Sequence, residues 1–240
     1  MSGTRTVVEV SGSVGDDQDQ IGDPLLPQQI ALAAEVRRLG DAVLGRAIDS
    51  DEMADLAAQL VTINDRLERS PRTPKSESLL RRNRVATFIE TGRWPDPPPN
   101  GSRIEFDPAS IVGGELNPFS MNARYYREGD EVVGFVNLGS CFEGPPSRVH
   151  GGVICAVFDE VMGSVFRATG TASAFTGELK VRFEAPAPLN IELEFRARLV
   201  ESSGRRRMLE GEARSPEGQF ATATGVFIEM KPEHFPEMSD

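Results

Sequence analysis

The first part of the chain carries apolar residues at helical spacing. They recur every three or four positions over 32–43 and again over 56–63, as on one face of an amphipathic helix. An Asp-Ser-Asp run at 49–51 interrupts the pattern, and such residues cap helix starts. The pattern predicts a pair of helices that serve in packing or oligomerisation and carry no chemistry.

The hydrophobic period changes beyond residue 120. The segment 121–139 has the pattern of a β-hairpin with its turn at Glu128-Gly129-Asp130. A long apolar run over 149–169 then predicts a helix that ends near Gly170. Four strand-like segments follow, separated by turn signals. Two strands, a helix and four strands predict an α+β fold, with an antiparallel sheet around one long helix.

These changes of pattern divide the chain into three parts. Residues 1–23 are polar and acidic and are expected to form a flexible tail. Residues 24–100 are predicted to form a helical extension and a linker, because "RWPDPPPN" at its end cannot form regular structure. The main domain is expected over 101–240.

Composition excludes several classes of function. A net charge of -11 argues against nucleic-acid or membrane partners, which select basic surfaces. The two cysteines offer neither a disulfide framework nor metal-ligand spacing. No apolar run approaches the ~18 residues of a membrane span, and the start of the chain has no signal-peptide pattern. We therefore expect a cytoplasmic protein without a metal.

The stretch "RVHGGVICAVFDEVMG" is the strongest candidate for chemistry. Gly151 and Gly152 open the predicted helix, and the first amides of a helix have no internal partners and attract negative charge. Asp159 lies seven residues beyond Gly152, which is close to two full turns, so both lie on one face. Glu160 points about 100° away from Asp159.

Helix geometry also constrains how such a site is built. Seven residues rise about 10 Å along a helix, whereas a base and a carbonyl polariser both lie ~3 Å from the reacting atoms. One helix does not easily supply both groups to one substrate, but two antiparallel copies do. A catalytic site here therefore favours a homodimer.

Each of these residues also has a purely structural interpretation. His150 alone is more typical of a residue that caps the helix and fixes the loop than of an acid–base catalyst, so we expect it to contribute, with Gly151, to substrate binding. Glu160 is more typical of a salt-bridge or hydrogen-bond partner than of a second catalyst. Asp159 can equally be a buried, hydrogen-bonded structural carboxylate, and only the combination with the glycine pair raises the case for function.

In combination, three segments resemble the hotdog-fold acyl-CoA thioesterases of the phenylacetate-pathway (PaaI-like) and human thioesterase-superfamily branch. The segments are "GPPSRVHGGVICAVFDEVMG", "TGELKVRFEAPAPL" and "TATGVFIEM", and the resemblance covers roughly residues 117–230. It implies a helix wrapped by a sheet, dimers formed through that sheet, and hydrolysis of acyl-CoA with no cofactor besides the coenzyme A of the substrate.

The resemblance also implies residue roles. Asp159 matches the catalytic acidic residue, which acts as general base on water or as nucleophile. Gly152, or its neighbour Gly151, matches the amide that polarises the thioester carbonyl, and Thr176 matches a residue that orients the water. Some relatives have an asparagine shortly before the histidine, and its absence from 144–147 leaves a second carbonyl donor unassigned.

An acyl-CoA substrate needs a phosphate site on this acidic protein. Arg205, Arg206 and Arg207 begin a strand after a Ser-Gly turn, where alternation places Arg206 on the face opposite to the other two. These arginines are candidates to bind the phosphates of coenzyme A. An exposed basic turn that keeps a sheet edge soluble is an equally good interpretation.

Two other functions compete with hydrolysis. A dehydratase acting on acyl thioesters needs a histidine beside an acidic residue of the helix, whereas His150 lies at the helix entry. A non-catalytic acyl-CoA-binding or regulatory module would use the N-terminal helices to contact a partner protein. The expected assembly is a homodimer or a dimer of dimers.

Overall fold

The structure is a computed structural model that describes residues 26–71, 87–88, 91–105, 107–171 and 173–230. The tail predicted over 1–23 lies outside these residues. None of the described helices is long and apolar enough to cross a membrane.

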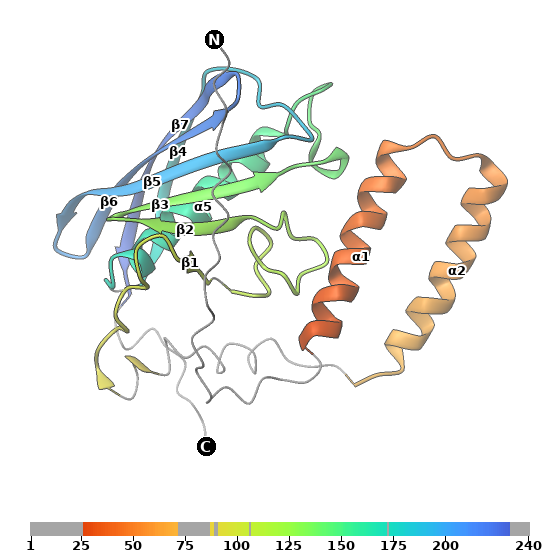
Figure 1. Ribbon diagram of the computed structural model, residues 1–240, viewed down its shortest axis with the longest axis horizontal. Coiled ribbons are helices and arrows are strands. Elements are labelled where there is room, and N and C mark those ends of the chain that lie inside the picture. Colours follow the sequence, from red (N-terminus) through yellow and green to blue (C-terminus); the bar gives the residue numbers. More distant parts are fainter. Residues whose placement is uncertain (1–25, 72–86, 89–90, 106, 172, 231–240) are drawn as a thin grey trace, which may run out of the picture.

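Two helices form an arm beside the main domain (Figure 1). They are α1 (Leu26–Gly45) and α2 (Ser50–Glu68). Asp49 caps α2, because its Oδ1 accepts hydrogen bonds from the backbone N–H groups of Asp51 and Glu52 at 3.0 and 2.9 Å. The predicted helix pair and its capping signal are confirmed.

The main domain contains one seven-stranded sheet in the order β1-β2-β3-β5-β6-β7-β4, in which all neighbours are antiparallel. The strands are β1 (Arg103–Ile104), β2 (Arg124–Glu128), β3 (Glu131–Asn137), β4 (Ala174–Phe183), β5 (Glu192–Ser203), β6 (Arg206–Ser215) and β7 (Gly218–Glu229). The predicted hairpin turn is confirmed, since Gly129 joins β2 to β3 with a φ of 63° that suits glycine.

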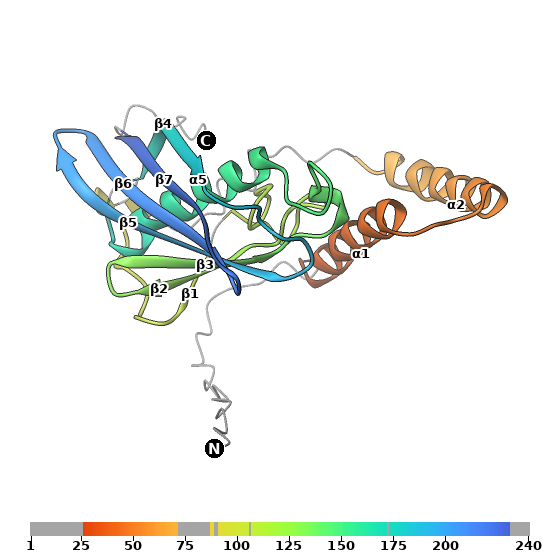
Figure 2. The same cartoon turned by 90° about the horizontal axis from the view of Figure 1, so that it is seen from above.

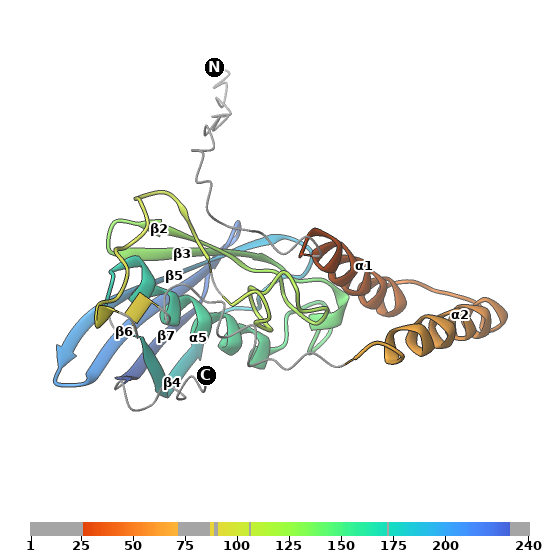
Figure 3. The same cartoon turned by 90° about the horizontal axis from the view of Figure 1, so that it is seen from below.

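The long helix α5 (Gly151–Ala168) lies against one face of this sheet (Figure 3). Its apolar side chains fill the core, and Phe158, Val161 and Met162 are fully buried. Burial of each such side chain stabilises the fold by about 1.5–3 kcal/mol. The ring of Phe158 meets Phe195 of β5 at 5.1 Å, edge to face. The predicted helix and the α+β class are confirmed.

The opposite face of the sheet is charged. Alternating residues of β5 point away from α5 and form ion pairs with neighbouring strands, such as Arg196 with Glu128 at 2.8 Å and Arg198 with Glu210 at 3.3 Å. This is the polar face that the alternation in "LEFRARLV" predicts. The apolar core therefore lies only between the sheet and α5.

Strand β4 differs from the rest of the sheet. It is an edge strand that pairs with β7 on one side, and its large apolar residues Phe175 and Phe183 are 56% and 51% exposed. Such an edge is a template for pairing with another chain.

The helical arm is attached to the domain through α1. Oδ1 of Asp41 accepts a hydrogen bond from the N–H of Ser140 at 2.5 Å, in the short helix η1 (Ser140–Phe142). Arg37 donates to the carbonyl oxygens of Glu115 and Asn117 at 3.1 and 2.7 Å. Figure 2 shows the arm projecting from the end of the domain, with α1 nearer to the sheet than α2. Neither β1 nor η1 was predicted from the sequence.

Candidate active site

His150 forms the N-cap of α5. Its backbone is extended, at φ -64° and ψ 133°, and its Nδ1 accepts a hydrogen bond from the N–H of Gly152 at 3.0 Å. The neighbouring Val149 donates its N–H to the carbonyl of Ala187 at 2.9 Å, which fixes the start of the helix against the chain that follows β4. The capping role expected for His150 is confirmed.

This cap distinguishes the two glycine amides. The N–H of Gly152 is bonded to His150, whereas no acceptor for the N–H of Gly151 lies among the described residues. A Cβ on Gly151 would lie 3.3 Å from the ring of Phe183, so the ring of this β4 residue lies over the start of α5. The amide at Gly151 is therefore the one available to an oxygen atom of a ligand.

Asp159 and Thr176 lie together although they belong to different elements. The hydroxyl of Thr176, on β4, donates to Oδ1 of Asp159, on α5, at 2.5 Å. The pairing register of β4 with β7 shifts between Thr176 and Glu178, and such a bulge re-aims a side chain. Asp159 is half-buried on the side of α5 that faces the β4 edge, which we call the β4 side.

The helix entry and Asp159 remain apart within one chain. Gly151 and Asp159 are eight residues apart on α5, which corresponds to about 12 Å of rise. Atoms of one thioester group cannot touch both. One copy of the chain therefore presents the two halves of the candidate site at separate places.

Glu160 lies on the other side of α5, in a different environment. Its carboxylate is 8% exposed and accepts hydrogen bonds from the hydroxyl of Ser110 and, at 3.1 Å, from that of Tyr125. Burial raises the pKa of Glu160, and these hydrogen bonds act in the opposite direction. Burial and the nearby Glu160 charge raise the pKa of Tyr125 well above its usual value.

Glu160 therefore holds the loop before β2 against the central helix. The sequence indicated a hydrogen-bonding role for Glu160, which is confirmed, but did not indicate its partners. Ser110 and Tyr125 are 50 and 35 residues away along the chain, and no local pattern marks either of them.

The three arginines are not equivalent. Arg205 donates to the carbonyl oxygen of Glu229 at 2.7 Å, and Arg207 forms an ion pair with the carboxylate of the same residue. Arg206 is exposed, and its guanidinium has no partner among the described residues. Across β6, β7 and β4, Arg207 is in register with Phe227 and Thr176, so this turn lies at the Thr176 end of the sheet.

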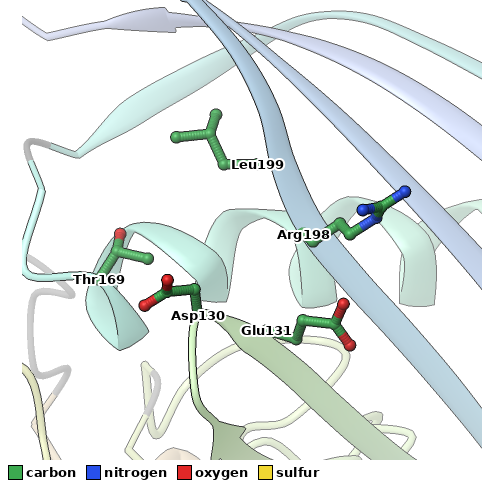
Figure 4. Close-up of a pocket in the computed structure, with 5 residues that line it drawn as sticks. All are labelled: Asp130, Glu131, Thr169, Arg198 and Leu199. Atoms are coloured by element: carbon green, nitrogen blue, oxygen red, sulfur yellow. The ribbon is translucent and has the colours of Figure 1, made fainter.

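A cavity of about 430 Å³ opens at the other end of α5 (Figure 4). Its lining residues are Asp130, Glu131, Thr169, Arg198 and Leu199. It includes neither Asp159 nor the glycine pair, so it is not the predicted site. The described part of the chain has no cluster of three potential metal-ligating residues, and Cys141 and Cys155 are free thiols.

Part of the chain is similar to known proteins. Residues 147–221 match the thioesterase superfamily. The acyl-coenzyme A thioesterase THEM4 of Bos taurus is 32% identical over 97 residues, which are 40% of this chain and 39% of that protein. The chain thus aligns with about two fifths of this relative's length.

One solved structure shares the fold of this protein over most of the chain. Protein RHA08564, a thioesterase superfamily protein, superimposes with a TM-score of 0.66 at 23% identity, over 84% of this chain and 90% of that one. A phenylacetic acid degradation-related protein of Ralstonia eutropha JMP134 gives a TM-score of 0.42 at 25% identity, over 45% and 85% of the two chains. The superposition on RHA08564 shows that the sheet and α5 share its fold, the hotdog fold, and residues 147–221 are similar to the thioesterase superfamily.

Proposed function

We propose that this protein hydrolyses acyl-CoA thioesters to a free acid and coenzyme A, with Asp159 as the catalytic carboxylate. The observation that carries the proposal is the hydrogen bond from Thr176 to Asp159, on the same helix whose entry, about 12 Å away, has an available amide. A thioester is already activated, so hydrolysis needs a positioned water, a base and an oxyanion site.

In the proposed reaction, Asp159 takes a proton from a water molecule as the water oxygen adds to the thioester carbonyl carbon. The negative charge that develops on the carbonyl oxygen is stabilised by the N–H of Gly151 and the positive end of the α5 dipole. The carbon–sulfur bond then breaks, and the thiolate of coenzyme A accepts a proton. Thr176 orients Asp159 through its hydroxyl.

We propose further that each site is shared by two copies that pair along the β4 edge. The rise of α5 separates Gly151 from Asp159 by about 12 Å in one chain, so the amide of one copy serves the aspartate of the other. The unpaired edge of β4, with its exposed Phe175 and Phe183, supports this arrangement.

For the coenzyme A moiety, Arg206 is the phosphate ligand that we propose from the arginine turn; it lies on the face of the sheet opposite to Thr176, so coenzyme A would pass around the end of the sheet to reach it. Its guanidinium is exposed and has no protein partner in the described structure, whereas Arg205 and Arg207 are both held by Glu229. Arg205 retains N–H groups that can contribute a second contact.

Release of free thiol from a panel of acyl-CoAs tests the proposal. Asp159→Asn keeps the shape of the side chain but removes the base, and should lower kcat/KM by about 10³-fold. Glu217→Gln, which removes an exposed carboxylate in the β6–β7 turn, serves as the control and should have no effect. Equal turnover by Asp159→Asn and the parent protein would refute a catalytic role for Asp159. Intact acyl-CoA binding without turnover in the parent would favour the binding module instead.

A pair of substitutions tests the role of Thr176. Thr176→Val removes the donor to the Asp159 carboxylate at nearly constant shape and should lower kcat/KM about 10- to 100-fold. Thr176→Ser keeps the hydroxyl and should retain most of the activity. Similar losses in both variants would indicate that packing, not the hydroxyl, matters.

Gly151→Pro tests the amide and the sharing of the site. Proline is tolerated at the first helical position and removes the N–H, and the extended backbone of His150 suits a following proline. Gly151→Ala, which adds the same Cβ 3.3 Å from the Phe183 ring but keeps the N–H, is the control. Gly151→Pro should lose about 10²- to 10³-fold in kcat. Mixed with Asp159→Asn, it should regain about a quarter of the parent activity, because each mixed dimer holds one intact site. No recovery after subunit exchange would place both groups in one chain.

A further inference from the structure

Helix α2 has no partner in the described structure for its apolar face. It contains no buried residue, and only Leu56 is even half-buried. In Figures 1 and 2, α1 lies between the domain and α2, so α2 stands on the outside of the molecule. Most of the stability of helices in proteins comes from packing of an apolar face, so we expect a second surface to cover this one.

Val61, which is 59% exposed, lies outside the main apolar row of α2, whereas the other five large apolar residues have the spacing of a coiled coil. They alternate by three and four positions, as a and d residues of a heptad do. We call them the α2 seam, and they are Met53, Leu56, Leu60, Ile63 and Leu67. The exposed fraction rises from 36% for Leu60 to 52% for Leu67. Such a continuous seam is built to pack against another helix.

We infer that α2 pairs in antiparallel fashion with α2 of a second copy of this chain. In an antiparallel pair, a residues of one helix meet d residues of the other. Met53 then lies beside the partner's Ile63, and Leu56 beside the partner's Leu60. The two-fold axis that relates the two helices generates each of these contacts a second time, with the two copies exchanged.

The charges that border the α2 seam fit this orientation. Glu52 and Arg66 flank the seam on the same side, 14 positions apart, and antiparallel pairing sets Glu52 beside the partner's Arg66 at both ends. Gln59, midway between them, meets the partner's Gln59 at the two-fold axis. A parallel pair would set Glu52 beside the partner's Ala57 and form no ion pair.

The other acidic residues of α2 do not oppose this contact, because their heptad positions face away from the seam. These residues are Asp51, Asp55, Asp65 and Glu68. Helix α1 offers further apolar surface for the second copy at Leu32, Val36 and Val43, which are 50%, 39% and 40% exposed. Combined with pairing along the β4 edge, the α2 contact makes an assembly of four chains.

Particle mass of the full chain, measured by light scattering after size-exclusion chromatography, tests this inference. Leu60→Glu buries a charge in the centre of the contact and should halve the number of chains per particle. Ala58→Glu adds the same charge on the opposite face of α2 and should leave the mass unchanged. An unchanged mass for Leu60→Glu would overturn the inference, because it would mean that another segment or another protein covers α2.

Charge reversal tests the register, and circular dichroism of each variant controls for helix content, because Glu52 in the first turn and Arg66 in the last turn also interact with the dipole of α2. Glu52→Arg alone, or Arg66→Glu alone, should weaken the association about tenfold in sedimentation velocity, since each brings like charges together at both ends. The double variant restores two ion pairs of reversed polarity and should recover the parent's affinity. A double variant as weak as the single variants would overturn the antiparallel pairing.

Discussion

On the β4 side of α5, Asp159 is half-buried, and its carboxylate accepts a hydrogen bond from the hydroxyl of Thr176. On the other side, which we call the loop side, Glu160 is buried and accepts from two hydroxyls. Two carboxylates that are adjacent in the sequence thus have different surroundings, because about 100° of helix rotation separates them. Glu160 thus holds a loop against the helix, whereas the carboxylate of Asp159 remains partly open to solvent.

Replacing each carboxylate by alanine should reveal the largest contrast. Glu160→Ala leaves the buried hydroxyls of Ser110 and Tyr125 without their acceptor and should reduce the free energy of unfolding by about 3–5 kcal/mol. Asp159→Ala should change it by less than about 1 kcal/mol, because its site is partly open to water. Urea denaturation of both variants measures this contrast. Equal destabilisation would show that both carboxylates are structural.

The glycines on the two sides of α5 should show a smaller contrast. A Cβ on Gly113 would lie 2.7 Å from Oε1 of Glu160 and 2.9 Å from the ring of Tyr125, whereas a Cβ on Gly163 meets nothing within 4 Å. Gly113→Ala should cost about 1–3 kcal/mol through overpacking. Gly163→Ala, one turn beyond Asp159 on the β4 side, should stabilise the helix by about 0.5–1 kcal/mol.

Thermal unfolding of these two variants gives the comparison. Stabilisation by both variants would mean that the loop side is as open as the β4 side, and destabilisation by both would mean that the β4 side is as closely packed as the loop side.

The hydroxyls that bind the carboxylates provide a third contrast. Tyr125→Phe removes a donor to a buried carboxylate and should lower the free energy of unfolding by about 1–2 kcal/mol. Thr176→Val removes the matching donor at Asp159, but should change stability by at most about 0.5 kcal/mol, and its effect should appear in turnover instead. Denaturation and thiol release, measured on the same preparations, separate these outcomes. Loss of stability in Thr176→Val would contradict the division between the two sides.

Features of the fold that depend on residues close together in the sequence could be predicted, whereas contacts between residues far apart in the sequence could not. The helix over 149–169, the turn at Gly129 and the cap at Asp49 depend on residues a few positions apart, and spacing alone revealed them. The pairing of Glu160 with Ser110 depends on a contact across 50 residues, which no local pattern encodes.

For the same reason the strand order, β1 and η1 had no signal in the sequence. The meeting of Asp159 and Thr176 was suggested by resemblance, because helical periodicity places Asp159 on a face but does not show which strand lies opposite. The glycine pair marked the entry of α5, but only the structure separates the bonded amide of Gly152 from that of Gly151.

The smallest expected effect is the pH dependence that Glu160 alone contributes. Burial raises its pKa above the usual 4.5, while donation from Ser110, Tyr125 and the Gly113 backbone and the charge of Arg167 oppose that rise. The folded protein therefore keeps this proton at a pH where the unfolded chain has lost it. The stability that Glu160 contributes is fully present below about pH 4.5 and is lost as the pH rises through the raised pKa.

The parent protein should therefore lose stability relative to Glu160→Gln as the pH rises from about 4.5 through the raised pKa of Glu160. The urea midpoints of the two proteins, compared between pH 4 and 8, measure how the difference in stability changes with pH. A parent protein that gains stability relative to Glu160→Gln as the pH rises would mean that the three hydrogen-bond donors outweigh burial.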